Sequence, residues 1–176
     1  MTKVGNILIE NGNVYKVYKI TVEEISSKSE RILYYRPLSK KSGIESLECS
    51  IPENSLLVSN MRMLSSKAEI DNFFKTLSSN DFLSTEEIDT DNAIKLLALN
   101  NIQKTALVIK YYWKEIVKSN AVTTKTMRDV FEKSINSILD EVSLVTGETP
   151  EKTRVKIEKQ LNKFFKIKPS ESKTLN

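Results

Sequence analysis

The spacing of apolar residues changes near residue 65, from alternation to a repeat of about 3.6 residues. Before that point, short runs rich in Val, Ile and Tyr are separated by turn residues such as Asn11-Gly12-Asn13. After it, apolar residues recur at steps of four and three. Alternation is the period of a β-strand, and 3.6 residues is the period of an α-helix. The chain is therefore predicted to have an α+β fold, with strands in its first part and helices in its second.

Five strands are expected in the first part of the chain. Short connections between short strands favour an antiparallel sheet, because parallel neighbours need long crossovers. Such a sheet is expected to curl into a small barrel. Val14, Tyr18 and Ile20 share a parity in the second strand. The expected strands are 6–10, 14–25, 31–38 and 45–51, with a short fifth at 56–58.

The clearest helical signal in the second part is the stretch 100–118, which contains the only tryptophan. Its apolar residues form one helical face and predict that this helix is the spine of a core. Asn100 can cap the first turn, and Gln103 can reach back to the amide of the cap. The residues of the face are Ile102, Ala106, Ile109, Trp113 and Ile116.

Cap signals mark the other helices. Ser65 or Ser66 can begin one helix, and Thr123, Thr124 or Thr126 can begin another. Gly147 is a typical helix stop, and Thr149-Pro150 is a typical helix start. The predicted organisation is a first domain at 1–78, an acidic linker at 79–92, a helical domain at 93–167 and a disordered tail at 168–176.

Composition excludes several kinds of site. The chain has no histidine and one cysteine, which excludes zinc sites and Cys-His catalysis. Its four glycines form no phosphate-binding loop. We expect no enzyme activity, no cofactor and no small-molecule ligand.

No apolar run approaches the roughly 20 residues that cross a bilayer. The first residues lack a signal-peptide core, and Cys49 has no internal disulfide partner. We therefore expect a cytoplasmic protein without membrane contact.

Charge is distributed unevenly along the chain, whose net charge is +4. The segment 81–91 contains five acidic residues and no basic residue. Residues 150–176 contain eight Lys and Arg against three Glu. This basic segment either meets phosphates or forms a solvated face, and the sequence leaves both open.

Six local strings occur in a fixed order along the chain. They are Lys3-Val4-Gly5, Tyr34-Tyr35-Arg36-Pro37-Leu38, Ile51-Pro52-Glu53-Asn54, Met61-Arg62-Met63-Leu64-Ser65, Lys104-x-Ala106-x-Val108-Ile109-Lys110 and Asp140-Glu141-Val142-Ser143-Leu144-Val145. In order and spacing they resemble the CarD/CdnL family of bacterial transcription regulators that bind RNA polymerase. The similarity covers nearly all of residues 3–166.

The resemblance implies a Tudor-like barrel that binds the polymerase beta subunit, followed by a compact helical domain near promoter DNA. Such proteins stabilise the open complex, recognise no fixed sequence and need no cofactor. We expect docking chiefly by main-chain pairing at an exposed strand edge, because edge addition tolerates side-chain changes. The candidate polymerase-binding residues are Tyr34, Arg36, Glu48 and Ser50.

Weak, sequence-independent contact with promoter DNA is the second expectation. Lys95, Lys104, Lys125 and Arg128 are assigned to helix starts, which would bring them together if those starts pack side by side. Phe82 is either a wedge at the minor groove, in the place where family members carry a tryptophan, or a linker residue packed on a helix. The alternative function is an adaptor that joins two proteins without touching nucleic acid. The acidic segment 81–91, and the absence of a basic run there, favour the adaptor.

Overall fold

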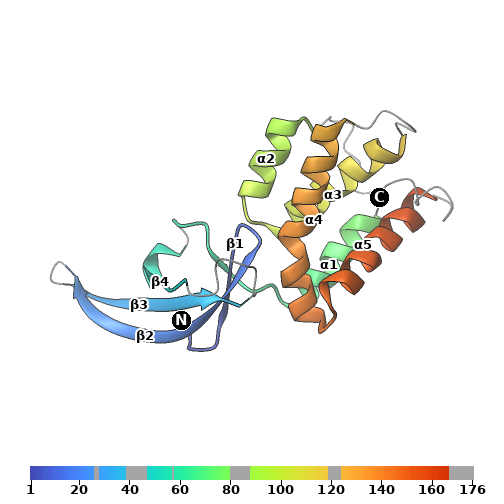
Figure 1. Cartoon of the computed structure of the whole chain (residues 1–176). Helices are drawn as coiled ribbons and strands as arrows, with labels where there is room; N and C mark the ends of the chain where they lie inside the picture. The colour runs from blue at the N-terminus through green and yellow to red at the C-terminus, as the bar shows by residue number, and fades with distance from the viewer. Residues whose placement is uncertain (26–27, 39–46, 57, 80–87, 119–123, 167–176) are drawn as a thin grey trace. The chain divides into compact units, whose positions relative to one another are not determined.

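The computed structural model describes residues 1–25, 28–38, 47–56, 58–79, 88–118 and 124–166. The chain forms two compact units, Met1–Leu64 and Ser65–Asn176. The first unit contains the strands and the second contains the helices (Figure 1). The predicted α+β fold is therefore confirmed.

The first unit is an antiparallel sheet of five strands in the order β4-β3-β2-β1-β5. The outer strands β4 and β5 do not pair with each other among the described residues, so the sheet is not closed. The predicted antiparallel sheet is confirmed, and a closed barrel is not. The strands are β1 (Ile7–Glu10), β2 (Asn13–Ile25), β3 (Lys28–Pro37), β4 (Cys49–Pro52) and β5 (Arg62–Met63).

The fifth strand lies later in the chain than predicted. Residues 53–55 form a 3-10 helix that follows Pro52, and β5 is the two-residue segment Arg62–Met63, which pairs with β1. A strand of two residues contains no alternation, so its position follows from its partner strand and not from its own sequence.

One face of the sheet carries the core of the first unit. Tyr15, Val17 and Tyr35 are buried on this face, and the rings of Tyr15 and Tyr35 meet edge to face with centroids 5.3 Å apart. The register places Val17 opposite Tyr35 and Tyr15 opposite Leu8. Opposite residues in an antiparallel pair project to the same side. Neighbouring positions of β3, such as Tyr34 and Arg36, therefore project to the other side.

The second unit contains five helices around α3. The helices are α1 (Lys67–Ser78), α2 (Thr90–Ala98), α3 (Ile102–Lys118), α4 (Lys125–Thr146) and α5 (Pro150–Phe165). The α3 helix packs against each of the other four. All five residues of its predicted apolar face are buried, and the ring of Trp113 packs against that of Phe131 at 5.3 Å. The prediction that this helix is the spine of the core is confirmed.

Most of the predicted helix ends are also found. Ser66, Thr124 and Thr149 are N-caps, and Gly147 ends α4 with a φ of 72°. The predicted cap of α3 was wrong by one residue. The Asn101 side chain accepts hydrogen bonds from the amides of Gln103 and Lys104, both at 3.0 Å. Asn100 has a left-handed φ of 49° and lies in the turn after α2.

The α1 helix belongs to the helical unit, although the predicted boundary at residue 78 placed it in the first domain. Ile70, Phe73 and Leu77 are fully buried in the helical core. The first residue of this unit is also held there, because the amide of Ser65 donates to the buried carboxylate of Glu141 at 3.0 Å. A helix joins the core that covers its apolar face, and the repeat within the helix does not reveal which core that is.

None of the helices in the part of the chain that the structure describes is long and apolar enough to cross a membrane. The described residues contain no group of His, Cys, Asp or Glu side chains arranged to hold a metal ion. The tail at 168–176 lies outside the described residues, as do residues 80–87 of the predicted acidic linker.

Candidate functional site

The side of the sheet opposite the core carries a row of aromatic and charged residues, which we call the polar face. It consists of Tyr18, Lys19, Glu23, Tyr34, Arg36 and Ser50 on β2, β3 and β4. The register aligns Lys19 with Tyr34, and Tyr34 with Ser50, across three neighbouring strands. Three of the four predicted polymerase-binding residues therefore lie on one face, and Tyr34 and Ser50 are direct cross-strand partners.

A bulge in β2 brings Tyr18 onto the polar face. The pairing of β2 with β3 shifts between Val17 and Lys19, so Tyr18 is an additional residue in the strand. The expected shared parity of Val14, Tyr18 and Ile20 is therefore broken. Tyr18 contacts residues of the polar face, whereas Ile20 packs on the core side. Alternation alone does not reveal such an insertion.

Tyr34 is the centre of one set of contacts. Its hydroxyl donates to Oε1 of Glu23 at 2.8 Å, and the Lys19 ammonium lies 4.9 Å from the centre of its ring. Thr21 also donates to Glu23, at 2.7 Å. The hydrogen bonds from Thr21 and then Tyr34 lower the pKa of Glu23 below its ordinary value. At neutral pH this carboxylate is charged and holds the Tyr34 phenol in place.

Tyr18 and Arg36 form the second set of contacts. The Arg36 guanidinium lies 5.6 Å from the centre of the Tyr18 ring, and the Tyr18 and Tyr34 rings are 6.4 Å apart. Desolvation raises the pKa of Tyr18, and the charge and hydrogen bond of the Glu48 carboxylate add to this effect. Glu48 therefore lies beside the polar face, although it precedes β4. All four predicted polymerase-binding residues are thus gathered at this end of the sheet.

The β4 strand forms one edge of the sheet. It pairs with β3 on one side, and no described strand pairs with its other side. Ser50 is exposed in the middle of this strand. Main-chain groups at an open edge can pair with a strand from another protein. The edge and the polar face together provide main-chain pairing sites beside aromatic and charged side chains.

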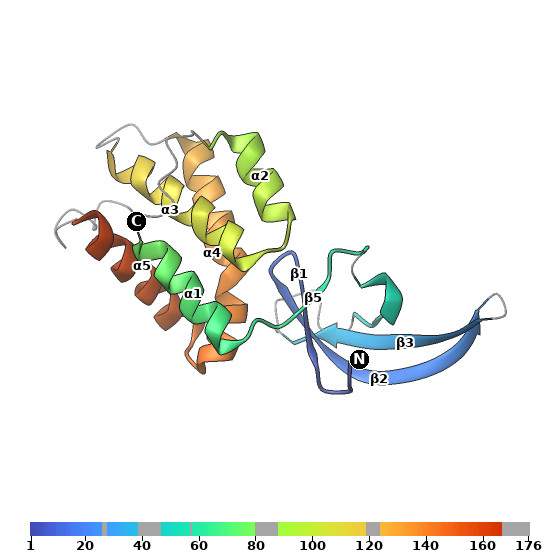
Figure 2. The same ribbon diagram turned by 180° about the vertical axis from the view of Figure 1, so that it is seen from behind.

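The structure does not gather the predicted DNA-binding residues. Lys95 lies in the last turn of α2, and not at a helix start as expected. Lys104 lies in the first turn of α3, whereas Lys125 and Arg128 lie in the first turn of α4. The α3 and α4 helices pack together and run in opposite directions (Figures 1 and 2). Their starts are therefore at opposite ends of the pair, so the condition under which helix starts would bring these residues together is not met for α3 and α4.

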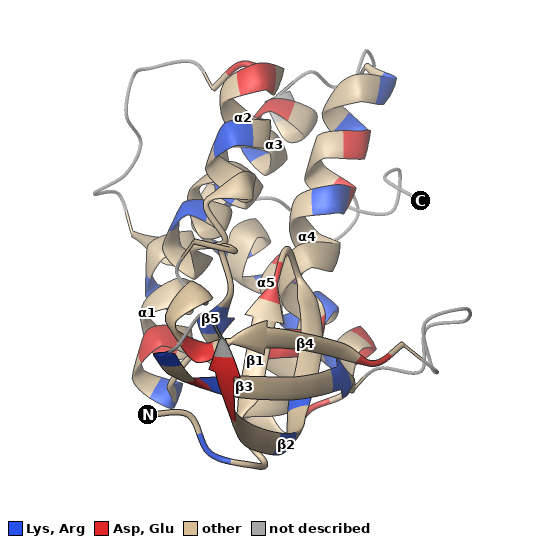
Figure 3. Ribbon diagram, turned by 90° about the vertical axis from the view of Figure 1, so that its left-hand side faces the viewer, with Lys and Arg blue, Asp and Glu red and all other residues tan. Residues whose placement is uncertain are grey.

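The physical reason is the short connection between α3 and α4. Only residues 119–124 join the two helices, and a connection of this length links antiparallel neighbours. All four basic residues are exposed. Figure 3 shows Lys and Arg interspersed with Asp and Glu along the helices. Phe82 lies outside the described residues.

Sequence reasoning missed Tyr18, Lys19 and Glu23 as members of the polar face. The exposed positions of β2 gave no separate signal, because the bulge changes which residues project to that side. No protein-family model and no curated protein matches the chain. The polar face and the β4 edge are therefore argued from their own geometry and chemistry.

Proposed function

We propose that this protein is a bacterial transcription regulator that binds the beta subunit of RNA polymerase and stabilises the promoter open complex, as CarD/CdnL proteins do. In this proposal the first unit is a Tudor-like module, and the protein acts in the cytoplasm. The observation that carries the proposal is the gathering of Tyr34, Arg36, Glu48 and Ser50 at the β4 end of the sheet.

Physical chemistry supports docking at this place. An open strand edge offers main-chain hydrogen bonds that do not depend on the partner's side chains. Tyrosine and arginine are enriched among the residues that dominate binding energy in protein interfaces. Here the contacts of Tyr34 with Glu23 and of Arg36 with Tyr18 hold both side chains in place before a partner arrives. Such ordering lowers the entropy cost of binding.

A binding experiment with the full-length protein tests the proposal. Titration of the polymerase beta lobe against wild-type protein should give binding at micromolar concentrations. We expect Tyr34→Ala to cost about 2 kcal/mol, which is roughly a 30-fold loss of affinity. Arg36→Glu should also weaken binding, because it reverses the charge next to Tyr18.

The matched control is Lys28→Glu, which makes the same charge change at the other end of β3. Lys28 is exposed and pairs with Ile25, far along the strand from β4. This variant should bind like the wild type. If the wild type does not bind at micromolar concentrations, or if Lys28→Glu is as weak as Arg36→Glu, docking through this part of the sheet is wrong.

The second candidate function is an adaptor that joins two proteins and does not contact nucleic acid. It is favoured by the separation of the predicted basic residues and by the mixed charges along the helices. One measurement that can exclude the adaptor is the lifetime of a promoter complex with polymerase, comparing wild type with Lys125→Glu plus Arg128→Glu at two salt concentrations. A shorter lifetime in the double variant would show contact with DNA. Equal lifetimes at both concentrations would show that this end of α4 makes no DNA contact.

A further inference from the structure

Lysines follow one face of α5 and its C-terminal cap. They occur at steps of four, three, four and three residues, which is the spacing of a single stripe on a helix. All of them are exposed. We call the set the lysine stripe, and its members are Lys152, Lys156, Lys159, Lys163 and Lys166.

The opposite face of α5 fixes the direction of the stripe. Thr153, Ile157 and Leu161 are fully buried against the helical core. The α5 helix packs against α4 and lies side by side with α1 (Figures 1 and 2). The helix cannot turn without exposing these residues, so the lysine stripe points away from the core of its own unit.

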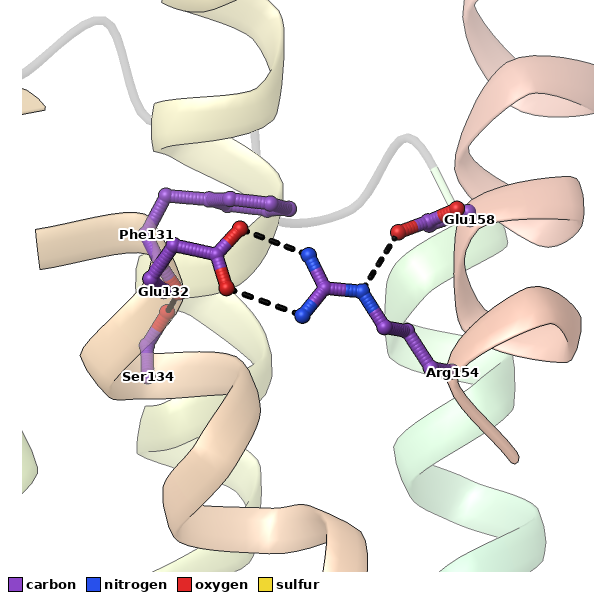
Figure 4. Close-up of polar contacts among 5 residues, drawn as sticks. All are labelled: Phe131, Glu132, Ser134, Arg154 and Glu158. Atoms are coloured by element: carbon purple, nitrogen blue, oxygen red, sulfur yellow. Dashed lines mark hydrogen bonds and ion pairs between the residues drawn. The ribbon is translucent and has the colours of Figure 1, made fainter. Parts of the chain in front are cut away.

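Acidic neighbours neutralise little of the stripe. Lys156 pairs with Glu148 at 3.2 Å and also lies 4.9 Å from the Phe74 ring. Glu158 is engaged by Arg154 on the flank of the helix (Figure 4). Among the described residues, the other four lysines of the stripe have no acidic partner within ion-pair distance. The stripe is therefore a row of positive charge.

We propose that the lysine stripe binds the phosphate backbone of duplex DNA, independently of sequence. Lysines one helical turn apart are spaced by about 5.4 Å, and the part of the stripe from Lys152 to Lys163 is about 16 Å long. Duplex DNA carries one charge per roughly 1.7 Å of axis, so a row of this length faces several phosphates. Each lysine acts as a point charge and needs no bidentate geometry.

Two other classes of partner fit the stripe less well. A helix that lies on a membrane buries an apolar face in the lipid, but the apolar face of α5 is in the core. Protein interfaces are depleted in lysine and enriched in aromatic residues and arginine. The stripe contains no aromatic residue and no arginine. Its large apolar neighbour on the exposed surface is Val155, at 63% exposure.

This inference rests on the proposed function and supplies its DNA contact, in place of Lys95, Lys104, Lys125 and Arg128, which the structure does not bring into one group. It is tested without polymerase, so that its failure and the failure of polymerase docking can be distinguished. The measurement is the fluorescence anisotropy of a labelled DNA duplex titrated with the full-length protein, between about 50 and 200 mM salt. Two duplexes of unrelated sequence should give the same affinity.

The expected result is a steep dependence on salt. Four to five phosphate contacts give a slope of log affinity against log salt of about −4, because each contact contributes roughly 0.9. In the triple variant Lys152→Gln, Lys159→Gln, Lys163→Gln, two lysines of the stripe remain. Its slope should fall to about −2, and its affinity near 50 mM salt should fall at least about tenfold.

The control is the triple variant Lys3→Gln, Lys16→Gln, Lys28→Gln, which makes the same charge change at exposed positions of the first unit. It should bind with nearly the wild-type slope, and the urea midpoints of both triple variants should match that of the wild type. The proposal is overturned if the wild type does not bind DNA at low salt, or if both triple variants lose affinity equally. Binding to phosphatidylglycerol vesicles without binding to DNA would assign the stripe to lipid and would also overturn it.

Discussion

Arg154 on α5 forms a bidentate ion pair with Glu132 on α4 through the two terminal nitrogens of its guanidinium. Nη1 donates to Oε2 at 2.8 Å and Nη2 donates to Oε1 at 2.6 Å (Figure 4). Nε donates to Glu158 at 2.9 Å, one turn further along α5. These hydrogen bonds, chiefly those with Glu132, raise the pKa of Arg154 above its ordinary value. The charged guanidinium thus joins two helices whose apolar faces pack beside it.

A double-mutant cycle with Arg154→Ala and Glu132→Ala should show a favourable coupling of about 0.5 to 1 kcal/mol. The two-pronged geometry raises the value, but both side chains are about a third or more exposed, which lowers it. The measurement is urea unfolding at low and high salt, and the coupling should shrink in high salt. Lys156 with Glu148 is the comparison pair, because its overall exposure is similar but it lacks the two-pronged geometry. An equal coupling there would contradict the role of that geometry.

The helical half of the fold was predictable because its signals are local. The face of α3 repeats over 17 residues, and its five predicted residues are all buried. The caps at Ser66, Thr124 and Thr149 also depend on neighbouring residues only. The error at α3 arose because Asn100 and Asn101 are both good caps, and local preference cannot choose between them. The turn after α2 uses Asn100 in a left-handed conformation, so Asn101 begins the helix.

Asn101→Ala should therefore destabilise the protein by about 1 kcal/mol, the typical cost of losing an N-cap. The alanine cannot accept the hydrogen bonds that the amides of Gln103 and Lys104 now donate to Asn101. Asn101→Ser or Asn101→Asp should retain most of the stability, because both side chains can cap. Urea unfolding midpoints provide the measurement. If the serine variant is as unstable as the alanine variant, Asn101 contributes something other than a cap.

The parts of the structure that could not be predicted depend on distant contacts. The α1 helix has a clear apolar face, but only its packing against α3 and α5 shows which unit it joins. The bulge at Tyr18 likewise exists only in relation to β3. Tyr34 and Ser50 are distant in the sequence but lie opposite each other, because β3 and β4 pair. Lys104 and Lys125 lie apart, because the helices that they begin run in opposite directions.

Tyr35 makes the stability of the sheet unit change with pH in the alkaline range. Burial, and then the negative charges of Cys49 and Glu10, raise the pKa of Tyr35 from 10.0 to about 12. The folded state therefore keeps this proton in a pH range where the unfolded chain loses it. The resulting stability is present below pH 10 and is lost as pH rises toward 12. The difference in unfolding free energy between wild type and Tyr35→Phe should thus decrease over this range. A difference that stays constant from pH 10 to pH 12 would show that the phenol ionises as easily in the folded protein as in the unfolded chain.

Lys110 is a buried residue of α3, and its ammonium lies at the C-terminal end of α1. It is 1% exposed, and its ammonium donates to the carbonyl oxygens of Thr76, at 3.2 Å, and of Ser79. The ammonium also lies 4.2 Å from the centre of the Phe164 ring on α5. The last carbonyls of a helix lack partners within the helix and carry partial negative charge. The Lys110 side chain therefore caps α1 from α3 and contacts α5 with the same group.

Replacing this lysine separates its polar and apolar contributions. Lys110→Met keeps most of the side-chain volume but leaves the carbonyls of Thr76 and Ser79 without the ammonium. Removing a buried charge relieves a desolvation cost, whereas losing hydrogen bonds to a charged group costs about 1.5 to 3 kcal/mol. We expect the second effect to prevail, because the cation is bound at the negative end of a helix and against an aromatic ring. The net loss of unfolding free energy in Lys110→Met should be about 2 kcal/mol.

Lys110→Ala should lose more stability, since it also leaves a cavity. Lys104→Met, at an exposed position of the same helix, should change stability by less than about 0.5 kcal/mol. Urea unfolding of the three variants decides the question, and a Lys110→Met protein as stable as the wild type would mean that the cost of burying the charge equals what its contacts contribute.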